Sequence, residues 1–186
     1  MSTSLVVLVL LAAAAFYGIF LYNGLVALRQ RVNQAFADID VQLKQRHDLI
    51  PNLVETVKGY ASHERGTLEA VVEARNAAIA ASGPDQVAAA ENVLTGALRQ
   101  LFALAESYPD LKASANFQQL QAELSDIENK IAAARRFFNN TVQEYNTSIE
   151  QFPASLFAGT LGFHHREFFD LGEVRPQLEQ PPSVKF

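Results

Sequence analysis

Two short stretches of the chain resemble fragments of metal-binding motifs, and their spacing argues against a metal site. His63-Glu64 begins like the zinc-protease motif H-E-x-x-H, which places two histidine ligands one helical turn apart. Thr67 occupies the position of the second histidine, so one of the two ligands is missing. His164 and His165 are adjacent, so their side chains would point apart on a helix. We therefore predict no metal ligands here and interpret His164 and His165 as surface histidines.

Other motifs that would mark an enzyme are also missing from the sequence. A di-iron helical bundle uses paired Glu-x-x-His motifs, and no glutamate of this chain has a histidine three positions later. There is no G-x-S-x-G motif and no glycine loop of the phosphate-binding kind. The chain has no cysteine, which removes thiolate ligands and cysteine nucleophiles. The sequence thus predicts no catalytic residues, no cofactor and no enzyme.

Five charged residues form the most informative polar set. They are Asp40, Lys44, Arg46, Asp48 and Glu55. Arg46 lies between Leu43 and Ile50, in a seven-residue gap of an otherwise regular apolar stripe. A charge at such a position must find a partner or reach water. One interpretation is a buried polar layer that contacts a partner or fixes how the helices assemble.

The alternative for these five residues is a solvated face, with Asp40 and Lys44 as an ordinary pair one helical turn apart, worth about 0.2–0.5 kcal/mol. We favour the solvated face because charged residues are seldom fully buried. In that case, replacing Arg46 with leucine leaves the stability of the bundle unchanged or raises it. A clear loss of folding or assembly supports the polar layer.

The N-terminal segment has the composition of a membrane span. From Leu5 to Tyr22 only Gly18 lies outside the apolar set, and the first charged side chain is Arg29. At about 1.5 Å per residue, this run spans about the hydrocarbon thickness of a bilayer. A cleaved signal peptide is less favoured, because residues 1–4 carry no Lys or Arg and the run is long for such a peptide. We predict a transmembrane helix over residues 5–22 after a tail of residues 1–4.

Charge asymmetry around the predicted span indicates its orientation. Residues 1–4 carry no Lys or Arg, whereas Arg29 and Arg31 follow the span, with Lys44 and Arg46 further on. The positive-inside rule then places the C-terminal domain in the cytoplasm. We predict a single-pass membrane protein that has the lipid bilayer as a partner. The net charge of -5 and the pI of about 5.4 argue against binding to nucleic acid.

Residues 23–152 carry apolar stripes with steps of three and four residues, the pattern of packed helices. The clearest stripes are Leu25, Leu28, Val32, Ala35, Ile39, Leu43, Ile50, Leu53 and Val57, then Val87, Leu94, Leu98 and Leu101, then Phe117, Leu120, Leu124, Ile127, Ile131, Phe138 and Tyr145. Pro51 predicts a kink or break in the first helix. Ser82-Gly83-Pro84-Asp85 predicts a stop, with glycine capping one helix and proline starting the next.

Short connections between striped helices favour antiparallel neighbours. Tyr108-Pro109-Asp110 is expected to end a helix, and Pro153 to stop the last one. The fold class is therefore all-α: a transmembrane helix followed by an antiparallel bundle of three or four long helices.

Residues 153–171 form an apolar, Gly- and Phe-rich segment after the bundle. Three roles stay open for it: closing one end of the bundle, lying on the membrane surface, or docking on a neighbouring subunit. Residues 172–186 contain three prolines and are expected to be disordered.

Several stretches are similar to the bacterial LemA family. They are YNGLVAL at 22–28, IDVQLKQRHDLIPNLVETVKGYA at 39–61, His63-Glu64, RRFFN at 135–139, Tyr145-Asn146, Phe152-Pro153 and LGF at 161–163. The similarity runs from the apolar segment to about Phe169, and the segment after it is expected to be peculiar to this chain. The resemblance implies a membrane-anchored antiparallel helical bundle and implies no reaction.

These observations favour a membrane-anchored helical scaffold or interaction protein that self-associates, and that organises the membrane where many copies assemble. Long apolar stripes offer a seam for a homo-oligomer or for an unidentified membrane protein partner. A sensor or signalling subunit coupled through the anchor helix is the alternative. A membrane-bound hydrolase is less favoured, and it requires catalytic groups that meet only in the folded chain.

Overall fold

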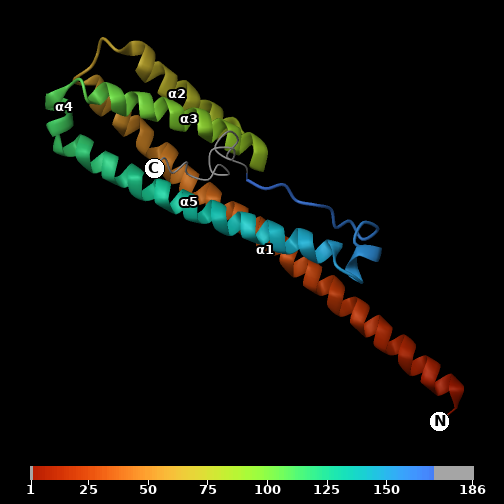
Figure 1. Cartoon of the computed structure of the whole chain (residues 1–186). Helices are drawn as coiled ribbons and strands as arrows, with labels where there is room; N and C mark the ends of the chain where they lie inside the picture. Colours follow the sequence, from red (N-terminus) through yellow and green to blue (C-terminus); the bar gives the residue numbers. More distant parts are fainter. Residues whose placement is uncertain (1, 170–186) are drawn as a thin grey trace, which may run out of the picture. The chain divides into compact units, whose positions relative to one another are not determined.

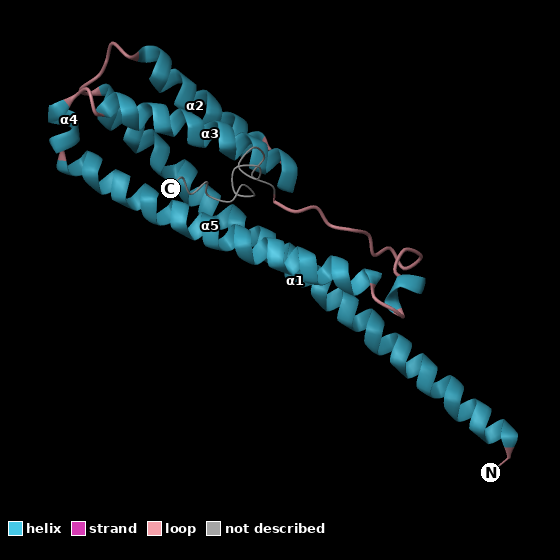
Figure 2. Cartoon of the chain, in the orientation of Figure 1, coloured by secondary structure: helices cyan, strands magenta, loops and turns pink. Residues whose placement is uncertain are grey.

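The computed structural model describes residues 2–169, and Figure 2 shows helices joined by loops. In chain order the elements are α1 (Thr3–Lys58), α2 (Arg65–Ala80), α3 (Pro84–Ala105), α4 (Pro109–Ala113), α5 (Ala115–Glu150) and the 3-10 helix η1 (Ala154–Leu156). No strand occurs among these described residues, which confirms the predicted all-α class. The predicted tail at 172–186 and residues 170–171 of the apolar segment lie outside the described residues.

The first helix is longer than a membrane span alone requires. α1 contains Pro51 and remains helical on both sides of it, so a break at this residue is wrong. Within residues 2–169, α1 is the one helix that is long and apolar enough to cross a membrane, judged by length and composition. None of the side chains from Ser2 to Gly24 is buried, and Leu25 is the first core residue.

The chain divides into two compact units, to both of which α1 and α5 contribute. Among the described residues, the two-helix unit comprises residues 2–37 together with Arg136–Glu167, and the bundle unit comprises Asp38–Arg135 together with Phe168 and Phe169. In the two-helix unit the parts of α1 and α5 run antiparallel (Figure 1), since Arg31 pairs with Glu144 whereas Phe36, further along α1, contacts Phe138. The buried residues of this unit include Val32, Ala35, Val142, Tyr145 and Ile149.

In the bundle unit, α2 and α3 pack side by side and the later part of α1 and the earlier part of α5 contribute to the same core (Figure 1). Most residues of the predicted stripes are buried in one unit or the other, whereas Leu28 and Leu120 are half-buried. The fully covered stripe residues of the bundle unit include Ile50, Leu53, Val57, Leu94 and Leu101, and Val71 of α2 and Leu111 of α4 are fully covered as well. Burial of large aliphatic side chains stabilises by about 1.5–3 kcal/mol each before entropy is counted, so these stripes hold the unit together.

The turn before α3 confirms one half of the predicted stop signal and corrects the other. Pro84 begins α3 and Asp85 lies in its first turn, where a negative charge complements the helix dipole. Gly83 does not cap α2, because the C-cap of α2 is Ala81 in extended conformation. Gly83 instead immediately precedes α3 with a φ of +83°, a conformation that glycine adopts without a steric cost.

Candidate functional site

Arg46 is the centre of a buried ionic cluster in the bundle unit. Its exposed fraction is 1 %, and that of Glu91 on α3 is 0 %. The Nη1 of Arg46 donates to Glu91 Oε2 at 2.9 Å, and its Nη2 lies 2.8 Å from Glu128 Oε1 on α5. The same Nη2 donates to Thr95 Oγ1 at 2.8 Å. The prediction of a solvated face is therefore wrong for Arg46. Its charge can be buried because carboxylates from two other helices contact it.

Glu91 holds a second partner on α1. The Nε2 of His47, a residue that is also buried, lies 2.6 Å from Glu91 Oε1. A carboxylate can only accept hydrogen bonds, so a hydrogen bond between these two atoms is donated by Nε2–H of His47. Both oxygens of Glu91 are thus engaged, one by Arg46 and one by His47. Desolvating a carboxylate is costly, and this pair of donors is what compensates for it.

Arg135 on α5 adds a second guanidinium to the cluster. Its burial lowers its pKa and the positive charge of Arg46 adds to that effect, while Glu91 and Glu128 act in the opposite direction. The guanidinium carbon lies 4.8 Å from the centre of the Phe169 ring, within the range of a cation–π contact. The cluster thus combines two arginines with two glutamates from three helices.

The other four residues of the predicted polar layer do not join Arg46. Lys44 pairs with Asp48 at 2.8 Å and Lys58 with Glu55 at 3.1 Å, both at exposed positions. Asp40 is exposed and does not form the predicted pair with Lys44, which bonds Asp48 instead. The hydrogen bond from Lys44 lowers the pKa of Asp48, whereas desolvation raises the pKa of Asp40. These four residues form a solvated face, as the alternative interpretation described for them.

Pro51 explains a further contact of the cluster. Proline has no backbone N–H, so the carbonyl of His47, four residues earlier, lacks its intrahelical donor. Arg75 on α2 supplies that donor, since its Nε donates to the His47 carbonyl oxygen at 2.7 Å. α1 therefore stays helical through Pro51 while a side chain of α2 is bound to the carbonyl that proline leaves open.

This compensation predicts a coupling between two substitutions. Arg75→Met is expected to lower the free energy of unfolding by about 1–3 kcal/mol, the cost of an unsatisfied acceptor on a buried residue. In a Pro51→Ala background the restored N–H can satisfy the carbonyl, so the same change should cost at least about 1 kcal/mol less. Denaturant titration of the four variants measures this difference. Arg99→Met, at an exposed arginine on α3, is the control and should cost the same in both backgrounds.

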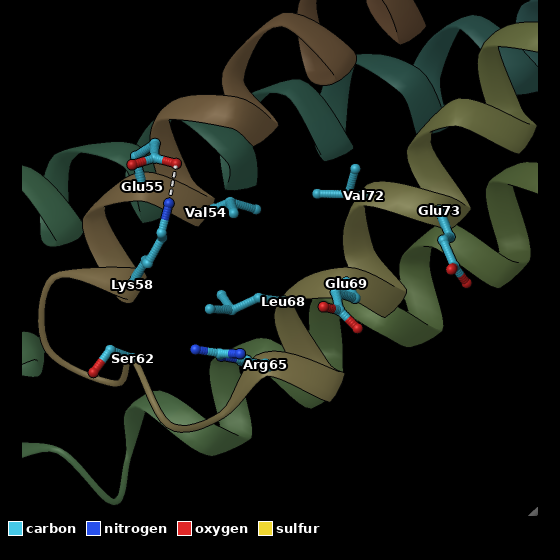
Figure 3. Close-up of a pocket in the computed structure, with 9 residues that line it drawn as sticks. All are labelled: Val54, Glu55, Lys58, Ser62, Arg65, Leu68, Glu69, Val72 and Glu73. Atoms are coloured by element: carbon cyan, nitrogen blue, oxygen red, sulfur yellow. Dashed lines mark hydrogen bonds and ion pairs between the residues drawn. The ribbon is translucent and has the colours of Figure 1, made fainter.

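The bundle unit also has a groove between α1 and the start of α2. It has a volume of about 700 Å³. Figure 3 shows Val54 of α1 opposite Leu68 and Val72 of α2, with charged residues around them. Those charged residues are Glu55, Lys58, Arg65, Glu69 and Glu73. No histidine lines the groove, and its mixture of an apolar floor and a rim of both signs fits a docked side chain better than a reaction.

The histidines singled out in the sequence are not members of the ionic cluster. His63 is exposed in the loop between α1 and α2, and His165 lies at the surface with Nε2 3.1 Å from Glu150 Oε1. Within residues 2–169 there is no group of three or more His, Cys, Asp and Glu side chains that could hold a metal ion. The buried ionic cluster is therefore the most distinctive polar site of the described chain.

The fold and the cluster define a class of protein: a helical bundle, held by a buried arginine–glutamate network, on a long helix with an exposed apolar N-terminal part. The model of the LemA family matches residues 35–186, and the chain belongs to this family. The family predicted from the sequence is thus confirmed. Because the match extends to residue 186, the expectation that the segment after Phe169 is peculiar to this chain is wrong.

Individual relatives agree with this assignment. The chain is 26 % identical over 171 residues to Protein LemA of Metamycoplasma hominis, covering 89 % of this chain and 77 % of that protein. It is 23 % identical over 191 residues to the magnetosome protein MamQ of Magnetospirillum gryphiswaldense, covering 86 % of this chain and 70 % of that protein. Magnetosome protein MamQ 2 of Paramagnetospirillum magneticum is also 23 % identical, over 95 % of this chain and 78 % of that protein.

Proposed function

We propose that the protein is a membrane-anchored helical scaffold that self-associates and organises the membrane around it. The observation that carries the proposal is the difference in exposure between the first and the later part of α1. Its first part exposes large apolar side chains, among them Leu8, Leu11 and Phe16. Its later part contributes Ile39, Leu43 and Ile50 to the core. One helix thus supplies both a surface that suits lipid and the core of the soluble part.

Anchoring follows from the energetics of that exposed surface. Each square ångström of apolar surface left in water costs about 25 cal/mol, and no side chain of the described chain buries these residues. A bilayer removes this cost along a helix whose backbone groups are already satisfied internally. In a bacterial cell membrane, the excess of arginine after the span favours an orientation that places the C-terminal part in the cytoplasm.

Self-association must use other surfaces than the predicted seam. Most of the striped residues are covered within the chain itself, so they are not available to a second copy. The apolar segment offers small residues instead: Ala14 and Gly18 are four positions apart on one face. A Cβ added at Gly18 would meet nothing within 4 Å, so this face is open. Small residues at this spacing allow two membrane helices to approach closely.

The proposal assigns no reaction to the protein. It is supported by the missing catalytic motifs and by the use of Arg46, Glu91 and Glu128 as mutual partners. A membrane-bound hydrolase would need a nucleophile beside a base, and its test is hydrolysis of model ester and peptide substrates by the purified full chain.

A sensor or signalling subunit is a second candidate, because α1 carries both the apolar segment and Arg46 of the ionic cluster. A displacement of α1 along its axis would change the contacts of Arg46 in that cluster. Deletion of the gene distinguishes the two candidates. A lost transcriptional response with unchanged membrane organisation favours the sensor, whereas altered membrane organisation favours the scaffold.

Self-association is tested by the mass and composition of the particle extracted from its own membrane in mild detergent. We expect a particle made of several copies of this chain. Gly18→Leu, which places a bulky side chain on the small face, is expected to weaken the assembly roughly tenfold, or about 1.4 kcal/mol. Gly24→Leu is the matched control, since Gly24 is equally open but follows the apolar segment. A monomer contradicts self-association, and a particle with a second protein would make the chain an adaptor.

A further inference from the structure

We infer that residues 152–161, here called the interfacial loop, form a second membrane contact that inserts apolar side chains at the membrane surface beside the end of the span. This inference rests on the membrane anchoring proposed above. It selects one of the three roles that the sequence left open for the apolar C-terminal segment. Four observations in the two-helix unit carry it: position, attachment, exposure and charge.

The position of the loop follows from the antiparallel packing of α1 and α5 (Figure 1). Phe36 contacts Phe138 with ring centres 5.6 Å apart, and Arg31 pairs with Glu144 at 3.1 Å. Each step toward the C-terminal end of α5 therefore approaches the N-terminal, apolar end of α1. The loop begins immediately after α5 ends at Glu150, so it starts near the point where the apolar segment of α1 stops.

The chain after the loop is attached to that same point. The ring of Phe163 packs edge-on against Tyr22, the last residue of the predicted span, with centres 5.6 Å apart. The guanidinium of Arg29 lies 5.1 Å from the centre of the Phe163 ring, and the exposed fraction of Phe163 is 2 %. Because Tyr22 lies where a span ends, this contact fixes the depth of the loop at the membrane surface.

A reciprocal pair of hydrogen bonds holds the returning chain to α5. Asn146 Nδ2 donates to the carbonyl of Arg166 at 2.9 Å, and the backbone N–H of Arg166 donates to Asn146 Oδ1 at 2.9 Å. The loop also closes on itself, since the N–H of Phe163 donates to the carbonyl of Ala158 at 2.9 Å. Gly162 adopts a φ of +76° at this closure, which favours glycine. These contacts hold the C-terminal end of the loop, and its N-terminal end follows directly on α5.

The side chains of the loop divide by size in an unusual way. Its small residues Ala154 and Ala158 are buried, whereas its large apolar residues are exposed. The exposed fractions are 80 % for Phe152, 66 % for Leu156, 40 % for Phe157 and 47 % for Leu161. Contiguous exposed apolar groups of this kind mark a protein or membrane contact. Beside the end of a membrane span, the occupant that these positions fit is the lipid surface.

The charges around the loop fit the same occupant. The guanidinium of Arg29 lies over the Phe163 ring, and His164 is exposed next to that ring, whereas Glu150, just before the loop, pairs with His165. Guanidinium groups recognise phosphate through paired N–H donors, so they suit lipid headgroups at this depth. A cationic group beside exposed apolar side chains favours contact with an anionic membrane surface.

The test uses the absence of tryptophan from the chain, which makes a single introduced indole a unique fluorophore. Leu156→Trp reports on the loop, Phe16→Trp on the span, and Phe137→Trp on an exposed position of α5. Phe137 adjoins Phe138, which contacts Phe36, and Phe36 lies roughly 21 Å beyond Tyr22 at about 1.5 Å per residue. The full chain is reconstituted in vesicles of anionic and zwitterionic lipids brominated at shallow or deep acyl positions.

We expect Leu156→Trp to lose most of its fluorescence to shallow bromines, Phe16→Trp to deep bromines, and Phe137→Trp to neither. If Phe16→Trp is not quenched, the anchoring itself fails. If Phe16→Trp is quenched and Leu156→Trp stays fully accessible to aqueous iodide, the anchor holds and the interfacial loop is overturned. Protection of Leu156→Trp from iodide without quenching by lipid also overturns it, because a protein surface then covers the loop. Circular dichroism confirms that each variant is folded.

Discussion

Replacing Arg46 with leucine is expected to lower the free energy of unfolding of the protein by about 3–5 kcal/mol. The reason is the state in which the substitution leaves Glu91. This carboxylate is fully buried, and Arg46 supplies one of the two donors that compensate for its desolvation. Leucine fills part of the space but leaves a buried negative charge with His47 as its remaining donor among the contacts described. Removing one member of a buried pair is far more costly than removing both.

The measurement is denaturant-induced loss of helical circular dichroism by the full chain in lipid nanodiscs. Lys44→Leu is the matched control, because it removes a cation from the same helix. Lys44 pairs with Asp48 at exposed positions, so its loss should cost about 0–1 kcal/mol. If the free energy of unfolding of Arg46→Leu equals that of the wild type and of the control variant, the buried pair contributes nothing to stability.

A second substitution separates the charge from the volume of the side chains. Combining Arg46→Leu with Glu91→Leu removes both buried charges, while Glu128, whose side chain is 43 % exposed, can turn toward water. The double variant is expected to recover most of the lost stability, since replacing a buried ion pair with apolar groups is often neutral or stabilising. A double variant as unstable as Arg46→Leu would instead indicate that the cost comes from packing.

The helices themselves were predictable because burial of a stripe leaves a direct record in the spacing of apolar residues. Ile50, Leu53 and Leu101 were placed in the core from spacing alone, and all three are fully buried. The turn at Gly83-Pro84 was visible for the same reason: residues with restricted or unusual backbone preferences mark helix boundaries without reference to the rest of the fold.

Only part of the ionic cluster could be predicted from the sequence, although the sequence contains a second signal for it. Arg46 interrupts one stripe between Leu43 and Ile50, and Glu91 interrupts another in the same way between Val87 and Leu94. Two gaps of equal length filled by opposite charges suggest a buried pair. The register of α1 against α3 decides whether the two charges meet, and local spacing does not encode that register.

The outcome at Pro51 depended on a residue far away in the sequence. A proline predicts an unpaired carbonyl at His47, and this prediction needs no structure. What the carbonyl binds is settled by α2, which presents Arg75 to it. A general limit follows for helical bundles: the sequence identifies which groups need a partner, and the packing of helices identifies the partner.

Introducing two arginines into the apolar segment is expected to remove the protein from the membrane. In the double variant Leu10→Arg and Ala14→Arg, the new charges lie one helical turn apart in the middle of the segment. Each arginine at the centre of a span costs about 2.5–3.5 kcal/mol, so together they oppose insertion by roughly 5–7 kcal/mol. Both positions are exposed in the structure, so the soluble fold should be unaffected.

The variant is synthesised in a cell-free system with liposomes, and the fraction that floats with the lipid after an alkaline wash is measured. The wash removes chains that are held only at the surface, including any held by the interfacial loop. Val41→Arg with Gln45→Arg is the matched control, with the same two charges at the same spacing on exposed positions of α1 beyond the apolar segment. We expect the control to float like the wild type and the test variant to stay in the soluble fraction. Because the two variants carry equal charge on one helix, a difference between them can come only from where the charges lie along α1, which is the claim that the first part of this helix belongs in lipid.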